Sequence, residues 1–200
     1  MTSQFLFLVS VIQEGQAVID LLDLSEDHTV KLPTPMRLFT NQNKHVSLLT
    51  MGIGMKAANE AMMYSLKQES FKSCTWINLG IAGHDHHSLG TFFEITKIHS
   101  HQSPVYFTLQ DSLKTEFPKD QLTTYSEFVK SYPKKYLVDM EAWMIAHHLS
   151  HHGLLEHLHV YKMISDNRHQ SLLTTPETRQ TLGELLREKS TLLLKTLQLH

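Results

Sequence analysis

Two short segments in the second half of the chain carry carboxyl groups able to do chemistry. Val138-Asp139-Met140-Glu141-Ala142-Trp143 puts acids at the start of an apolar helical stretch, and Ser165-Asp166-Asn167 follows an apolar run that ends at Ile164. Carboxyl groups give and take protons in many catalytic reactions. Each segment also has a structural explanation, because the helix dipole favours acids in a first turn and Ser-Asp-Asn suits a turn or an N-cap. Neither segment alone decides the function.

Two glycine-containing segments precede these acids. Gly52-Ile53-Gly54 stands between an apolar run and a stretch rich in Ala, Met and Leu, and Ile77-Asn78-Leu79-Gly80-Ile81-Ala82-Gly83 carries another apolar run into small residues. Glycine lets the backbone approach a ligand closely, and the start of a helix offers free N–H groups. Taken alone, each segment is equally well explained as a tight turn.

The elements that must position these segments alternate along the chain. Short apolar runs predict strands at 5–12, 36–40, 45–50, 74–79, 91–98, 104–109, 136–138 and 159–164. Helical patterns predict helices at 14–24, 55–67, 140–152 and 176–197. This alternation predicts an α/β fold, a three-layer α/β/α sandwich around a mixed, mostly parallel sheet, in a single domain over 1–200. Asn41-Gln42-Asn43-Lys44 predicts a hairpin turn. In open α/β sheets ligands bind at the carboxyl ends of strands, where several of these runs end in glycine or polar residues.

The composition is that of an ordinary globular protein. The 200 residues suffice for a sizeable core, and a formal net charge of −2 provides no basic field for nucleic acid or an anionic membrane. The lone cysteine, Cys74, excludes an internal disulfide and suits a reducing compartment. The apolar start, Met1 to Val11, lacks a basic region and is shorter than the roughly 20 residues that span a bilayer. We therefore expect a cytoplasmic protein without nucleic-acid or membrane partners.

Taken together and in this order, the four segments resemble the nucleoside phosphorylase and nucleosidase superfamily. Gly52-Ile53-Gly54 is similar to its G-I-G turn, and residues 78–83 are similar to its N-x-G-x-A-G loop. Residues 138–142 resemble its V-x-M-E-A segment, and residues 164–166 resemble its I-S-D. The likeness covers most of the chain. It is closest to the hydrolase branch, typified by methylthioadenosine/S-adenosylhomocysteine nucleosidase and futalosine hydrolase.

The resemblance implies roles for the matching residues. Asp166 would protonate N7 of a purine as the general acid, a contribution of about 10²–10⁴ in rate. Glu141 would accept hydrogen bonds from the ribose hydroxyls, and Met140 would pack on the sugar. The hydrolases also place a water-orienting carboxylate after the first strand, where Glu14 stands here, although a shift of one residue puts Gln13 there instead. Further substrate-binding positions fall on Ile81, Ala82, Gly83 and Ser165.

The same resemblance favours hydrolysis of a purine-type nucleoside. Phosphorolysis needs an anion site that usually contains arginines, and this chain has only Arg37, Arg168, Arg179 and Arg187, with no G-x-P-x-R loop. Asn78 stands where phosphorylases often have arginine. The implied partners are a small-molecule nucleoside and a second copy of the chain in a homodimer, with no cofactor. A catalytically impaired nucleoside-binding or regulatory protein, or a phosphorylase, is the alternative.

Three departures from the family pattern bear on the activity. Gly83 is followed by His84 instead of a second glycine, and Ile81 replaces a serine of the methylthioadenosine enzymes. The stretch 110–136 lacks a recognisable purine-stacking segment. The ring could come from Phe107, Phe117, Tyr125 or Phe128.

Histidine is abundant, with 15 residues in the chain. His147, His148, His151 and His152 repeat at i, i+4, a spacing that can hold zinc or nickel. No third-ligand pattern completes such a site, so we expect a solvated helix end and no metal. His84, His86 and His87 lie beside the predicted pocket, where they would make ligand binding depend on pH, or form a surface loop.

Overall fold

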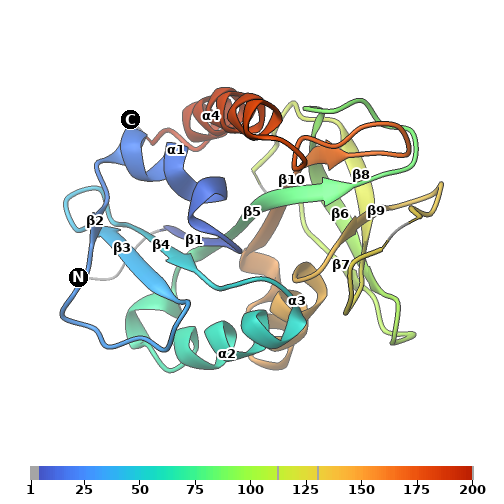
Figure 1. Cartoon of the computed structure of the whole chain (residues 1–200). Helices are drawn as coiled ribbons and strands as arrows, with labels where there is room; N and C mark the ends of the chain where they lie inside the picture. Colours follow the sequence, from blue (N-terminus) through green and yellow to red (C-terminus); the bar gives the residue numbers. More distant parts are fainter. Residues whose placement is uncertain (1–4, 112, 130, 200) are drawn as a thin grey trace.

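The computed structural model describes residues 5–111, 113–129 and 131–199, so the expectation for Met1 to Val11 is described only from Phe5 onward. One ten-stranded sheet runs through the molecule (Figure 1). Its strands are β1 (Phe5–Val9), β2 (Ser25–Glu26), β3 (Arg37–Asn41), β4 (Val46–Thr50), β5 (Thr75–Gly83), β6 (Phe92–Ser100), β7 (Phe107–Thr108), β8 (Lys119–Thr124), β9 (Leu137–Asp139) and β10 (Leu158–Asp166).

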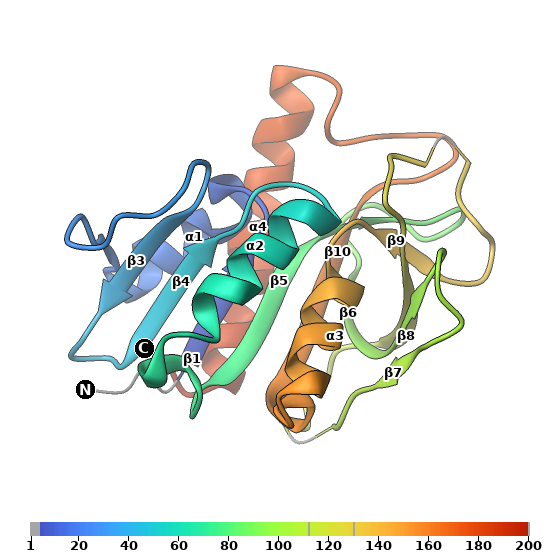
Figure 2. The ribbon, with the colours of Figure 1, turned by 90° about the horizontal axis from the view of Figure 1, so that it is seen from below.

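Helices cover both faces of this sheet. On one face lie α1 (Ile12–Leu22) and α4 (Pro176–Thr196), and on the other lie α2 (Met55–Ser65) and α3 (Ala142–His151) (Figures 1 and 2). Two short 3₁₀ helices, η1 (Glu69–Phe71) and η2 (Leu155–His157), precede β5 and β10. The predicted three-layer α/β/α sandwich is confirmed.

Successive side chains of β1 point to opposite faces of the sheet, and this alternation explains why the core has two layers. Leu6 and Leu8 of β1 pack in the cluster beneath α2 and α3, whereas Phe7 and Val9 pack in the cluster beneath α1 and α4. All four side chains are fully buried. Because successive residues of a strand point to opposite faces, a run that is apolar at every position belongs between two helix layers.

The sheet is mixed, and the long pairings at its centre are parallel. β1 lies between β4 and β5, and β10 runs parallel to β5 on the far side. β3 and β4 form the antiparallel hairpin predicted from residues 41–44. Beyond β5 the sheet curls, because β10 pairs with β6, β6 with β8, β8 with β9, and β9 again with β5 at Gly83 and Val138. Strands β5 and β10, whose ends carry residues of the predicted site, belong to this closed end (Figure 2).

Several boundaries differ from those predicted, and strands β2 and β8 fall outside every predicted run. Helix α1 begins at Ile12, inside the predicted strand, because the Glu14 side chain accepts backbone hydrogen bonds from Ser10 and Val11 and so caps its own helix. Strand β5 continues to Gly83 because β10 pairs with it along its whole length. Strand β8 was not predicted, since Leu122 is its only buried aliphatic residue and its order comes from pairing with β6 and β9.

Helix ends follow the expected chemistry. Pro176 occupies the first turn of α4, and the Thr175 hydroxyl accepts from the Thr178 amide at 3.3 Å. Gly153, with φ +69°, follows the end of α3. Among the described residues, no helix combines the length and apolar character needed to cross a membrane.

Candidate active site

A cavity of about 230 Å³ opens at the carboxyl ends of β1, β5 and β10 and at the start of α3. Open α/β sheets bind their ligands at this position, outside the carboxyl ends of the strands. All the site residues predicted from the sequence line this one cavity, namely Glu14, Ile81, Ala82, Gly83, Met140, Glu141, Ser165 and Asp166.

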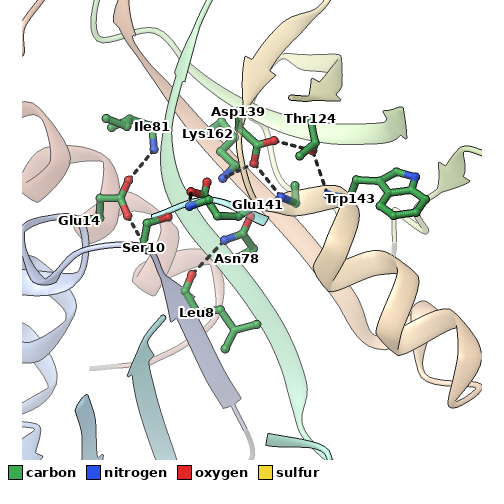
Figure 3. Close-up of polar contacts among 12 residues, drawn as sticks. Leu8, Ser10, Glu14, Asn78, Ile81, Thr124, Asp139, Glu141, Trp143 and Lys162 are labelled. Atoms are coloured by element: carbon green, nitrogen blue, oxygen red, sulfur yellow. Dashed lines mark hydrogen bonds and ion pairs between the residues drawn. The ribbon is translucent and has the colours of Figure 1, made fainter. Parts of the chain in front are cut away.

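Glu14 is held inside the cavity by the backbone. Its Oε2 accepts from the amides of Ser10 at 2.7 Å and Val11 at 3.2 Å, and its Oε1 accepts from the amide of Ile81 at 3.2 Å (Figure 3). Burial raises the pKa of Glu14 above its usual 4.5, while Lys162 and these three amides oppose the rise. Gln13 is exposed and faces a neighbouring groove instead. Of the two alternatives for the water-orienting residue, only Glu14 lines the cavity.

Glu141 links the segment 138–143 to the glycine turn at residues 52–54. Its Oε1 accepts from the Gly54 amide at 2.6 Å. Gly54 has φ +92°, a conformation that L side chains rarely adopt, so the turn before α2 requires glycine there. Met140 and Glu141 lie just before α3 begins at Ala142. Burial and the neighbouring Asp139 raise the pKa of Glu141 to about 7.

Lys162, which the sequence analysis did not single out, is a buried cation that pairs with Asp139, a residue that lines the cavity. It lies on β10 with 1% of its side chain exposed, and its Nζ is 3.0 Å from Oδ2 of Asp139 (Figure 3). Burial disfavours its charge, but Asp139, Glu141 and Glu14 outweigh burial and raise the pKa of Lys162. A lysine inside a mostly apolar strand, four residues before Asp166, is the sequence signal that could have identified it.

Asp139 connects this lysine to the start of helix α3. Its Oδ1 accepts from the Thr124 hydroxyl at 2.6 Å, and its Oδ2 accepts from the Ala142 amide at 2.9 Å. The Trp143 amide donates to the Thr124 hydroxyl oxygen at 2.9 Å. Asp139 and Thr124 therefore restrain the first turn of α3 and, with it, Met140 and Glu141, the two residues that precede the helix.

Gly80 keeps Lys162 and Glu14 close together. A Cβ atom at Gly80 would lie 3.1 Å from Oε1 of Glu14 and 3.3 Å from Nζ of Lys162. Both distances are tighter than ordinary van der Waals contact, so a larger residue there would push the acid and the ammonium apart. The small residues of the segment 77–83 thus make room for charged side chains.

Asp166 lines the same cavity from the end of β10. The pairing with β5 is irregular between Ile164 and Asp166, which turns the end of the strand toward the cavity. The Ser165 hydroxyl donates to Oδ1 of Asp166 at 2.5 Å. Burial raises the pKa of Asp166 from 3.8 to about 6, so the carboxyl holds a proton at weakly acidic pH.

The segment between β8 and β9 supplies aromatic rings to the cavity. Phe128 lines it with 69% of its surface exposed, and Tyr132 lines it beside Gly83. A Cβ at Gly83 would lie 2.3 Å from the Tyr132 ring, so this glycine is needed for the ring to pack there. The other three rings named above lie elsewhere: Phe107 faces Trp143, Phe117 faces Phe92, and Tyr125 stacks on His101.

His147 and His148 of α3 are half-buried and pack against neighbours, whereas His151 and His152, at and just after the end of the helix, are exposed. The His147 ring stacks on Trp143 with centroids 4.8 Å apart, and Nε2 of His148 lies 2.8 Å from Oδ1 of Asn59 on α2. Within residues 5–111, 113–129 and 131–199, no three His, Cys, Asp or Glu side chains are grouped to hold a metal ion.

Comparison with solved structures identifies the fold as that of the methylthioadenosine nucleosidases. The Arabidopsis thaliana 5′-methylthioadenosine nucleosidase in its apo form matches with a TM-score of 0.79 at 15% identity, over 98% of this chain and 95% of that one. The Helicobacter pylori 5′-methylthioadenosine/S-adenosylhomocysteine nucleosidase with butyl-thio-DADMe-Immucillin-A matches with a TM-score of 0.78 at 14% identity, over 99% of each chain. The corresponding Colwellia psychrerythraea 34H nucleosidase in complex with adenine matches with a TM-score of 0.75 at 17% identity, over 99% of this chain and 96% of that one. No protein-family model matches the sequence, and no curated protein matches it.

Proposed function

We propose that this protein is an N-ribosyl hydrolase that cleaves the glycosidic bond of a purine-type nucleoside. One observation carries the proposal: a carboxyl group with a raised pKa, Asp166, shares a single cavity with a second carboxylate, Glu14, and with Glu141. Cleavage of this bond needs a proton for the leaving base and a base for the attacking water, and the cavity offers both. The structures with the same fold are named for this chemistry.

In the proposed reaction the bond between C1′ of the sugar and N9 of the purine breaks, and its electron pair stays with the base. Asp166 donates its proton to N7, which makes the base a better leaving group. Water attacks C1′ as positive charge develops on the sugar, and Glu14 takes the proton that the water loses. Glu141 accepts hydrogen bonds from the ribose hydroxyls, and its negative charge stabilises the cationic sugar. The products are a free purine and the sugar with a hydroxyl at C1′.

The surroundings of Glu14 favour water over phosphate as the nucleophile. The amides of Ser10, Val11 and Ile81 already donate to the Glu14 carboxylate, so they are taken by an internal anion. No arginine or lysine is among the described residues that line the cavity. Asn78, buried beneath it, donates from Nδ2 to the Leu8 carbonyl at 3.1 Å and brings no positive charge. A phosphate anion would meet carboxylates here.

Two further features suggest how the rest of the nucleoside is held. We assign Phe128 as the ring that stacks on the purine, because it lines the cavity and is largely exposed without a ligand. A second cavity, of about 370 Å³, shares Ser10, Val11 and Ile53 with the first and extends to Arg37. We assign this groove to the 5′ substituent of the sugar.

We also propose a cytoplasmic homodimer without a nucleic-acid partner. Ile53 is 66% exposed at the edge of both cavities, and Met63 on α2 is 50% exposed. A second copy that covers Ile53 would enclose the sugar end of the site. Light scattering tests the dimer directly, because the monomer has a mass of 23.0 kDa.

The decisive experiment incubates the protein with adenosine, inosine, methylthioadenosine, S-adenosylhomocysteine and futalosine, with and without phosphate, and measures free base. Release without phosphate that disappears in Asp166→Asn is the expected result. Release that depends on phosphate contradicts hydrolysis. Activity that survives in Asp166→Asn contradicts the mechanism, and ligand-induced thermal shifts without any release indicate a binding protein.

A further inference from the structure

The loop that follows β5 is bound to the turn that carries Asp166. His84, the first residue of this loop, donates its backbone amide to the Asp166 carbonyl at 3.1 Å. Nδ2 of Asn167 donates to the His87 carbonyl at 3.0 Å. Two consecutive residues at the end of β10 are therefore attached to residues 84–87.

An ion pair adds a third attachment. Nε and Nη2 of Arg168 each donate to one oxygen of the Asp85 carboxylate at 2.9 Å, a bidentate pair. Asp85 is only 4% exposed, and Nε2 of His86 also lies 2.9 Å from its Oδ2. Arg168 stands two residues after Asp166, so this pair restrains the backbone that turns the Asp166 carboxyl into the cavity.

The loop keeps its shape through the His84 ring. Nδ1 of His84 accepts from the amides of His86 at 3.0 Å and His87 at 3.1 Å. An imidazole nitrogen accepts hydrogen bonds only when it carries no proton, so this arrangement requires neutral His84. The ring is 4% exposed and stacks on the His87 ring with centroids 3.9 Å apart.

The adjoining turn makes the same motif with a side chain that does not titrate. Oδ1 of Asn167 accepts from the amides two and three residues ahead, those of His169 at 2.9 Å and Gln170 at 3.0 Å. Asparagine is the usual residue for this motif. Histidine in the equivalent place of the other loop makes the motif dependent on pH.

We propose that His84, Asp85 and Arg168 are positioning residues for Asp166, and that protonation of His84 opens the loop and releases the Asp166 turn. The proposal rests on the role of Asp166 in the proposed function. The groups that face His84 are His86, His87 and Asp85 of its own loop and Asp120 of β8. Burial, His87 and His86 lower the pKa of His84 below 6.5, and Asp120 and Asp85 oppose that shift. The release therefore takes place on the acid side of neutrality.

The test replaces His84 with asparagine, which supplies an acceptor at the same place without titrating. As the pH falls from about 8 to about 5, we expect kcat of the wild type to fall more steeply than kcat of His84→Asn, with KM changed less. Comparison at equal pH cancels the titration of the other acids. His151→Asn, at the exposed end of α3, is the matched control and should follow the wild type. Parallel profiles for the wild type and His84→Asn overturn the proposal.

A second pair of variants tests the ion pair. Arg168→Gln and Asp85→Asn should each lower kcat roughly 10- to 100-fold, the range expected from displacing a catalytic group by about 1 Å. The double variant should be no slower than the slower single one, because both changes break the same link. Additive losses contradict a shared link.

A readout that needs no turnover separates this proposal from the proposed function. Hydrogen exchange of residues 163–172 is compared between the wild type and His84→Asn at each pH. Faster exchange in the wild type at about pH 5, with equal exchange at about pH 8, supports the release even if no substrate is cleaved. Equal exchange at both pH values overturns it. Loss of base release in Asp166→Asn with an unchanged His84→Asn profile leaves the proposed function in place.

Discussion

The Lys162 ammonium lies 3.0 Å from Oδ2 of Asp139, and only 1% of each side chain is exposed. Two charges removed from water in this way are stable only as a pair. In Lys162→Met the carboxylates of Asp139, Glu141 and Glu14 keep no buried cation, so we expect unfolding to become easier by about 3–5 kcal/mol. Urea denaturation at neutral pH measures this loss.

Lys162→Met should also shift the pH dependence of base release upward. Lys162 lowers the pKa of Glu14, whose ionised form the proposed reaction needs, so removal of the ammonium moves that ionisation to higher pH.

Lys72→Met is the matched control for the stability loss, because Lys72 pairs with Glu69 at the surface and such pairs contribute about 0–1 kcal/mol. Equal stability losses in the two variants contradict a special role for the buried pair.

Asp166→Asn should lose activity and, above about pH 6, gain stability relative to the wild type. Burial raises the pKa of Asp166 from 3.8 to about 6, so the folded state disfavours the ionised carboxyl. The contribution of Asp166 to stability is complete below about pH 3.8 and is lost as the pH rises through 6. Above that pH the asparagine variant should be more stable than the wild type, by up to about 3 kcal/mol.

Thermal unfolding of Asp166→Asn and the wild type across this pH range measures the effect, and base release should be absent in the variant throughout. The difference in Tm should vanish at about pH 3 and below, where Asp166 is protonated in both the folded and the unfolded state. Glu60→Gln, at an exposed position of α2, is the matched control and should change Tm less than Asp166→Asn does. A variant that is less stable than the wild type at about pH 8 contradicts the raised pKa.

The sequence predicted those parts of the site that depend on local pattern. Strands that are apolar at every position indicate burial on both faces, and small or acidic residues after them mark the cavity at the sheet edge. Gly54 illustrates the limit, because its amide donates to the Glu141 carboxylate, 87 residues away in sequence. The pattern located the residue but not its partner.

Other features depend on contacts that no local pattern contains. Strand β8 is polar along most of its length and is ordered by its neighbours β6 and β9. Phe128 follows it in a segment without helical or strand periodicity, so nothing near it in sequence distinguished it from Phe117. Lys162 was visible as a charge in an apolar strand, yet its partners come from β9, α1 and the residue before α3.

Glu14→Gln should abolish most of the activity while the fold persists. Both carboxylate oxygens accept backbone hydrogen bonds, and glutamine cannot take a proton from water or present two acceptor oxygens to the amides of Ser10 and Ile81. We expect kcat to fall about 10²- to 10⁴-fold. Circular dichroism checks the fold, and single-turnover assays measure the chemical step.

Gln13→Ala is the matched control for Glu14→Gln. Gln13 is exposed and faces the groove that we assign to the 5′ substituent, so with adenosine, which has only a hydroxyl at that position, its removal should change kcat less than about 3-fold. The opposite result, with Gln13→Ala inactive and Glu14→Gln active, would move the water-orienting role by one residue. Added phosphate should not restore Glu14→Gln, because the amides of Ser10, Val11 and Ile81 still face the side chain at position 14.

Phe128→Ala should weaken binding of the purine without destabilising the fold. The ring is 69% exposed and lines the cavity, so it contributes little to the core, whereas stacking on a base contributes about 1–3 kcal/mol. KM should rise roughly 5- to 150-fold with a smaller change in kcat.

Tyr125→Ala, whose ring stacks on His101 away from the cavity, is the control for Phe128→Ala and should leave KM unchanged. Titration with adenine measures the base interaction alone, and an unchanged affinity in Phe128→Ala would transfer the stacking role to Tyr132, the other aromatic ring that lines the cavity within the described residues.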